Sequence, residues 1–181
     1  RFYERKEIRD AIAYFRASIS SDDGMAFERI INTPKRGFGE KSLQLMNMVA
    51  REHSISLMAA ARIAVDRSML PAKVSGDLDI LLNNFKRWNS YFLDDTKDHT
   101  KVAETILDES GYTEMWLIEK SADAPGRLEN LKELIKALSE FENIQGFLEH
   151  ISLIMEMESD SNIPKVSIMT LHAAKGLEFP V

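Results

Sequence analysis

The chain has 181 residues, a formal net charge of −6 and 44% hydrophobic residues. This length fits one domain with a buried core, or one domain with short flanking segments. The absence of cysteine excludes disulfides and thiolate metal sites. No apolar run in the sequence approaches the length of a membrane span, so we expect no membrane contact. An acidic chain has no overall attraction for nucleic acid, so any such contact must come from a locally basic patch.

Apolar residues recur at helical spacing along most of the chain, which predicts a mainly α-helical, compact multi-helix fold. The expected helices lie at residues 5–19, 25–31, 57–65, 71–92, 102–107, 112–118, 128–141 and 144–157, with a further helix after Ser42. Residues 94–99 and 121–126 are polar or rich in turn-forming residues, so we expect loops there.

The periodicity changes near the C-terminal end. Residues 158–162 are polar and predict a solvent-exposed linker, and residues 166–171 alternate in the manner of a β-strand. A lone strand is not stable by itself, and this sequence predicts no partner strands. The chain also begins at Arg1 without an initiator methionine and stops within an apolar stretch at Val181. We therefore interpret it as a module cut from a longer protein, whose parent sheet would hold the strand.

Residues 26–41 form the first candidate binding element. Their charged residues are Arg29, Lys35, Arg36 and Lys41 against Glu28 and Glu40, which gives a net charge of +2 (four minus two). Gly37 and Gly39 flank Phe38 between two predicted helices. Glycine permits positive φ and close approach to the backbone, so amides here and at the next helix start could bind a phosphate while Phe38 anchors the turn. A tight turn with solvated charges is the alternative, and spacing alone favours it.

Residues 170–178 form the second candidate element, just beyond the predicted strand, where ligands bind in open α/β sheets. Thr170 and His172 could bond phosphate oxygens, and Lys175 could place a positive charge against a phosphate. Glu178 could accept hydrogen bonds from a sugar hydroxyl. An ordinary strand and loop with surface charges explains the same residues equally well.

No metal site is expected. His53, His99 and His150 are far apart in the sequence, and none has a second histidine or a carboxylate at ligand spacing.

Several segments resemble the UvrD/Rep/PcrA-type superfamily 1 DNA helicases. Residues 170–180, Thr-Leu-His-Ala-Ala-Lys-Gly-Leu-Glu-Phe-Pro, are similar to motif V of that family. Residues 1–10 resemble its segment just after motif IV, and residues 27–39 resemble the opening of its subdomain 2B. Residues 110–112 and 127–131 also fit, so the resemblance covers the whole chain in the right order.

The resemblance implies three parts. Residues 1–10 would be a strip of motor subdomain 2A or its hinge, residues 11–163 the helical subdomain 2B, and residues 164–181 a strip of 2A that carries motif V. The family moves 3′ to 5′ along single-stranded DNA and unwinds duplex, using ATP and Mg²⁺. Subdomain 2B would then be an arm that swivels as a rigid body to grip the duplex or to regulate unwinding. The helix-hairpin-helix-like element would lie in 2B, and the strand would belong to the α/β motor.

The resemblance also implies site residues. The duplex DNA contacts would be Thr33, Lys35, Arg36, Gly37, Phe38 and Gly39. The single-stranded DNA contacts would be Thr170 and His172, and the nucleotide side would hold Lys175, Gly176 and Glu178. Phe38 stands where the family commonly has isoleucine, and Ala173 stands where it often has serine, which removes a hydroxyl contact.

The sequence lacks a Gly-x-x-x-x-Gly-Lys-Ser/Thr loop and an acidic Mg²⁺ motif. We therefore expect no complete catalytic set and no ATP hydrolysis by this chain alone, with ATP and Mg²⁺ bound only by the parent helicase. The expected partners are single-stranded and duplex DNA, the rest of the motor and accessory repair proteins, in the bacterial cytoplasm at the nucleoid. Two alternatives stay open: a stand-alone helix-hairpin-helix DNA-binding domain and a helical protein-interaction module.

Overall fold

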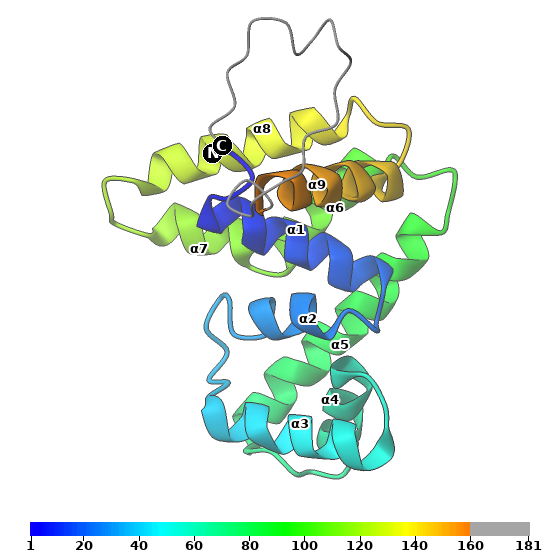
Figure 1. Cartoon of the computed structure of the whole chain (residues 1–181). Coiled ribbons are helices and arrows are strands. Elements are labelled where there is room, and N and C mark those ends of the chain that lie inside the picture. The colour runs from blue at the N-terminus through cyan, green and yellow to red at the C-terminus, as the bar shows by residue number, and fades with distance from the viewer. Residues whose placement is uncertain (160–181) are drawn as a thin grey trace, which may run out of the picture.

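A computed structural model describes residues 1–159, and the regular structure in that range is helical throughout (Figure 1). The helices are α1 (Lys6–Ile19), α2 (Gly24–Ile30), α3 (Glu40–His53), α4 (Leu57–Asp66), α5 (Ala72–Phe92), α6 (His99–Glu109), α7 (Tyr112–Ile118), α8 (Ala124–Leu138) and α9 (Ile144–Ser159). The mainly helical prediction is therefore confirmed for this range. The predicted strand and the second candidate element lie outside the described residues. None of the described helices combines the length and apolarity that crossing a membrane requires.

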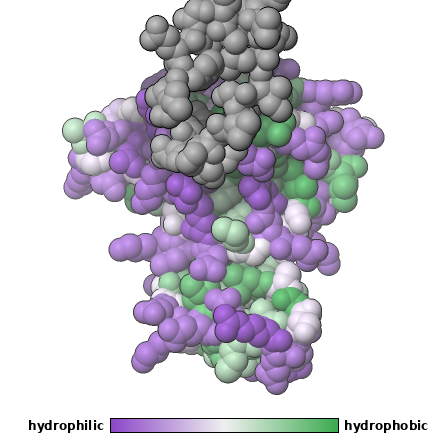
Figure 2. All heavy atoms as spheres, in the orientation of Figure 1, coloured by the Kyte–Doolittle hydropathy of each residue, from purple (hydrophilic) through white to green (hydrophobic). Residues whose placement is uncertain are grey.

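Helix α5 connects two groups of helices (Figure 1). Its first half packs with α4, which in turn packs on α3, and its second half packs against α1 and α6. Helices α7, α8 and α9 complete the larger group, and α2 lies between the two groups. Figure 2, in the same orientation, shows hydrophobic residues over the visible face of the smaller group and at the right of the larger group, with hydrophilic residues around them.

Phe85 on α5 is the aromatic centre of the core. Its ring centroid lies 6.3 Å from that of Tyr14 on α1, 5.9 Å from that of Phe27 on α2 and 5.2 Å from that of Trp88. The Phe85 side chain is 2% exposed. Because its neighbours come from three helices, this ring holds α1, α2 and α5 together.

Buried charged groups on α1 are paired across the fold. Arg29 Nε donates to Asp10 Oδ1 at 2.7 Å, and Asn130 Nδ2 donates to Glu7 Oε1 at 2.7 Å. Both carboxyl side chains belong to buried residues. Burial of unpaired charge is costly, so these contacts fix where α1 lies against α2 and α8. Helix α1 runs unbroken past residue 10, where the first predicted domain boundary falls.

Two predicted loops are partly helical, and each error has a local cause. Helix α6 begins at His99, three residues before the predicted start, because the Asp98 side chain accepts from Thr100 N at 2.9 Å and caps it. Helix α8 begins at Ala124 with Pro125 in its first turn. Proline suits that position because its missing N–H is not needed there. Apolar spacing detects neither signal.

Substitution of Phe85 by alanine should lower the free energy of unfolding by about 3–5 kcal/mol, because it removes a fully packed aromatic side chain. Ile80 on the same helix is 62% exposed, so Ile80→Ala should change stability by no more than about 0.5 kcal/mol. Urea denaturation of both variants measures the difference. Equal losses would contradict the central place of Phe85.

Tyr112 makes stability sensitive to alkaline pH. Its buried hydroxyl lies 3.1 Å from Glu7 O and 3.3 Å from Asp10 Oδ2. Burial first, and then the Asp10 charge, raises the pKa of Tyr112 well above its ordinary value of 10.0. Above about pH 10 the Tyr112 hydroxyl loses its proton in the unfolded chain but keeps it in the folded chain. The free energy of unfolding should therefore fall as pH rises, by up to about 1.4 kcal/mol per pH unit for this group.

The variant Tyr112→Phe should show a shallower decline in unfolding free energy between about pH 10 and 11, since it removes one such group. Urea denaturation at a series of pH values measures both slopes. The comparison uses slopes because the variant also loses a buried hydrogen bond at every pH. Identical slopes would show that Tyr112 does not hold its proton in the folded state.

Candidate functional site

Residues 31–39 connect α2 to α3 and are called the hairpin below. The side chain of Asn32 organises this segment, because its Oδ1 accepts from Arg36 N at 2.9 Å and from Phe38 N at 3.2 Å. A single carbonyl oxygen thus holds two backbone amides and closes the turn. The backbone of the hairpin is therefore fixed from within before any ligand binds.

Side chains in the hairpin alternate between outside and inside. Lys35, Gly37 and Gly39 are exposed, Arg36 is half-buried, and Phe38 is 5% exposed within the core. The predicted anchoring of the turn by Phe38 is confirmed. This alternation leaves one ammonium group and two side-chain-free backbone positions on the outer surface.

Gly37 and Gly39 differ in whether the local backbone conformation requires glycine. Gly37 has a φ of +70°, which strongly favours glycine, and a Cβ there would lie 3.5 Å from Val74 Cγ2. Gly39 has an extended backbone with φ −94° and ψ 177°, and a Cβ there would meet no atom within 4 Å. Internal geometry therefore explains the glycine at 37 but not the glycine at 39.

Gly39 is also the N-cap residue of α3 and provides no side-chain cap. Serine, threonine, aspartate or asparagine usually accepts hydrogen bonds from the first-turn amides at this position. In α3 no side chain does so at the N-cap, and the helix dipole makes these amides attractive to an anion. Ser42 N donates to Gly39 O at 3.1 Å, so the first-turn amides beside this open space that lack a side-chain cap are those of Glu40 and Lys41.

The guanidinium of Arg36 points into the fold. Its Nη1 donates to Ile30 O at 3.0 Å and to Ile31 O at 3.1 Å. Its Nη2 donates to Tyr14 Oη at 2.8 Å and to Ser110 O at 2.9 Å. These acceptors belong to three separate parts of the chain, so Arg36 ties the hairpin to α1 and to the end of α6.

Tyr14 extends this network. Its hydroxyl donates to Thr33 O while it accepts from Arg36 Nη2. Burial raises the pKa of Tyr14 above its ordinary value, despite the opposing effect of the Arg36 charge, so the hydroxyl keeps the proton it donates. The carbonyl of Thr33 is thereby used within the protein, and its residue is half-buried.

The six predicted duplex-contact residues fall into two groups. Lys35, Gly37 and Gly39 face outward, while Thr33, Arg36 and Phe38 have contacts or burial within the fold. The other predicted site residues lie outside the described residues: Thr170, His172, Lys175, Gly176 and Glu178. Among residues 1–159 no group of three or more His, Cys, Asp or Glu is placed to hold a metal ion.

Sequence reasoning missed the residues that support the hairpin. Asn32 had a detectable signal, because asparagine just before a Thr-Pro pair often bonds backbone amides in a turn. Tyr14 and Ser110 had none, since they contact Arg36 across 22 and 74 positions of sequence.

Replacement of Arg36 by methionine should lower the free energy of unfolding by about 2–3 kcal/mol, because it removes the donors to Ile31 O and Ser110 O, while Ile30 O still accepts from Thr33 N. Replacement of its neighbour Lys35 by methionine should change it by no more than about 0.5 kcal/mol, because Lys35 is exposed. Thermal or urea denaturation separates the two. A neutral Arg36→Met would mean that its internal hydrogen bonds contribute little.

The comparison with known proteins covers the whole chain. Residues 1–181 match the family described as UvrD-like helicase C-terminal domain. DNA helicase II of Rickettsia typhi is 46% identical over 183 residues, with 100% of this chain and 28% of the relative covered. The ATP-dependent DNA helicase PcrA of Bacillus subtilis is 36% identical over 197 residues, with 100% of this chain and 26% of the relative covered.

A third relative, DNA helicase II of Escherichia coli, is 33% identical over 192 residues, with 99% of this chain and 26% of the relative covered. The chain thus spans 26% to 28% of the length of these relatives. Because the family match extends from the first residue to the last, the chain belongs to the UvrD-like helicase C-terminal domain family.

Proposed function

We propose that this chain is the part of an ATP-dependent 3′–5′ DNA helicase that contacts duplex DNA, with a helical subdomain 2B at residues 11–163. The hairpin binds the sugar–phosphate backbone without reading the base sequence. The relatives named DNA helicase II and PcrA support the activity of the whole protein. The hairpin contact rests on the geometry of the described residues.

The observation that carries the proposal is Gly39. The backbone there has no internal need for glycine, the space beside it is open, and the first turn of α3 has no side-chain cap. A phosphate oxygen would fill that space and accept hydrogen bonds from the uncapped amides. Glycine is the residue that permits the approach, because any side chain would stand in the way.

Charge near Gly39 favours an anion. Lys35 and Lys41 are both exposed on either side of it, while Glu40 is the acidic residue between them. Two ammonium groups beside a helix N-terminus favour phosphate over a neutral ligand. The attraction is local, which suits a chain whose net charge is −6.

The network of Arg36 refines the roles of the six predicted residues. Lys35, Gly37 and Gly39 form the duplex contact, with Thr33 at its edge. Arg36 and Phe38 support it from inside, since the guanidinium bonds five acceptors within the fold and the ring is in the core. A rigid support lowers the entropy cost of binding.

The second candidate element has its role in the whole helicase. Thr170 and His172 contact single-stranded DNA, and Lys175, Gly176 and Glu178 face the bound nucleotide. ATP and Mg²⁺ are held by the complete motor, which works in the bacterial cytoplasm on nucleoid DNA. The family to which the chain belongs supports these proposed roles.

A second candidate function is docking of an accessory repair protein on α7. Leu117 and Ile118 are adjacent large apolar residues, 65% and 71% exposed. Exposed apolar neighbours are typical of interaction surfaces. Leu117 and Ile118 lie at the C-terminal end of α7, whereas the hairpin meets its N-terminal end, where a Cβ on Gly111 would lie 3.6 Å from Pro34 Cγ.

Substitution of Gly39 by serine tests the hairpin contact. Serine suits an N-cap, so the variant should be as stable as the wild type or more so. Its hydroxyl would occupy the open space and accept from the amides that a phosphate needs. We expect the affinity of the chain for a fluorescently labelled DNA duplex to fall roughly tenfold, because the variant loses one charge-assisted hydrogen bond to a phosphate.

The matched control is Gly126→Ser in the first turn of α8, where a Cβ also meets no atom within 4 Å. The Gly126→Ser variant should leave duplex affinity unchanged.

Lys35→Gln should reduce the slope of log affinity against log salt by about 0.9, whereas Lys136→Gln on α8 should not change that slope. Absence of duplex binding by the wild-type chain at low salt, or equal binding by the Gly39 and Gly126 variants, would overturn the proposal.

A further inference from the structure

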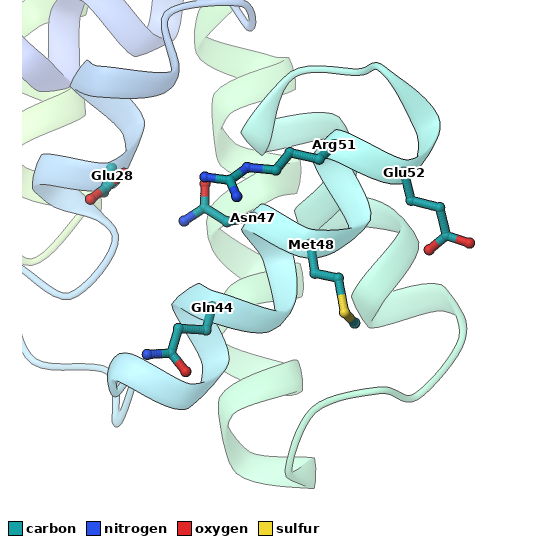
Figure 3. Close-up of a pocket in the computed structure, with 6 residues that line it drawn as sticks. All are labelled: Glu28, Gln44, Asn47, Met48, Arg51 and Glu52. Carbon is teal, nitrogen blue, oxygen red and sulfur yellow. The ribbon is translucent and has the colours of Figure 1, made fainter.

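The outer face of α3 carries a row of hydrogen-bond donors beyond the hairpin. Gln44, Asn47 and Arg51 are three and four residues apart, which puts them on one side of the helix. Figure 3 shows these three side chains extending toward the side of α2, while Met48 and Glu52 point elsewhere. They are called the α3 face below.

The α3 face lines an open cleft of about 850 Å³ whose other residues are Glu28, Met48 and Glu52. Glu28 comes from α2 and stands across the cleft from Arg51 (Figure 3). The cleft is far larger than one ion and is open to solvent, so it suits a segment of a chain-like ligand better than a small molecule held on all sides.

The chemistry of the α3 face matches a phosphate backbone. Gln44 Nε2 donates to Glu40 Oε1 at 3.2 Å and Asn47 Nδ2 donates to Leu43 O at 3.2 Å. Each amide group has two N–H donors, so one remains for a ligand. Arg51 is exposed and adds a permanent positive charge. Side chains of these three types make many of the phosphate contacts in protein–DNA complexes.

Charge is concentrated along this part of the chain. Residues 35–51 contain Lys35, Arg36, Lys41 and Arg51 against Glu40, so their net charge is +3 (four minus one) in a chain of −6. The lining of the cleft itself has Arg51 against Glu28 and Glu52, so its formal charge is −1 (one minus two) and Arg51 is its one positive group. Of these cations Arg36 bonds acceptors inside the fold, so the exposed ones are Lys35 in the hairpin and Lys41 and Arg51 on α3.

We propose that the α3 face is a second contact with the backbone of the same duplex, with Arg51 as its charged group. This inference rests on the proposed function of the hairpin. Arg51 is twelve positions beyond the N-cap Gly39, which is about 18 Å along α3 at 1.5 Å per residue. Arg51 is therefore too far away to share a phosphate with Gly39. It must bind a different one, and the two contacts can be measured separately.

The test is the salt dependence of duplex binding by the 181-residue chain and its Arg51→Gln variant. Loss of one charged phosphate contact should reduce the slope of log affinity against log salt by about 0.9 and lower affinity roughly three- to tenfold at about 50 mM salt. Arg51→Lys should keep the slope of the wild type, because it keeps the charge. Arg9→Gln, an exposed arginine on α1, is the control and should change neither quantity.

The outcomes distinguish this inference from the proposed function. If Gly39→Ser weakens binding while Arg51→Gln binds like Arg9→Gln, the second contact is overturned and the hairpin contact stands. If Arg51→Lys loses the slope as Arg51→Gln does, a charge contact is overturned as well. If the wild-type chain binds no duplex at low salt, the proposed function and the second contact fail together.

Discussion

Three parts of the chain meet at one guanidinium. Arg36 donates to Ile30 O at the end of α2, to the hydroxyl of Tyr14 on α1 and to Ser110 O after α6. Arginine keeps its charge inside a protein and offers five donors in a planar fork, so it needs several acceptors around it at once. Displacement of the hairpin would break the hydrogen bonds of the Arg36 guanidinium and leave both the charge and its acceptors unpaired. This free-energy cost resists local opening.

The position of Arg36 decides what its neighbours can do. The turn closed by Asn32, with Gly37 at φ +70°, directs Arg36 and Phe38 into the fold. With Arg36 and Phe38 held inside, Lys35, Gly37 and Gly39 are left on the outer surface. The outer surface of the hairpin therefore carries one ammonium group and two glycines, because Arg36 and Phe38 are held inside the fold. In the proposed contact, supporting and contacting residues alternate along residues 35–39, so substitutions of the two kinds would affect DNA binding for different reasons.

The sequence predicts most helices because their buried residues recur at helical spacing, as Phe85 and Trp88 do on α5. It fails at the starts of α6 and α8, where the signals are the polar cap Asp98 and the proline Pro125. In the hairpin, Phe38 was predictable as an anchor because it is apolar between glycines. The internal role of Arg36 was not predictable. Its partners Tyr14 and Ser110 are distant in the sequence, and the sequence alone does not show that they contact it.

An acidic chain that binds DNA needs its positive charge on one face. At about 0.1 M salt, charges more than about 10 Å apart are largely screened, so a phosphate bound at Gly39 as proposed would respond to Lys35, Lys41 and the adjacent Glu40 more than to distant carboxylates. Some of those carboxylates are also neutralised internally, since Asp10 pairs with Arg29. The remaining acidic surface would repel a duplex that approached from any other side. Net negative charge would then orient binding at the hairpin and the α3 face.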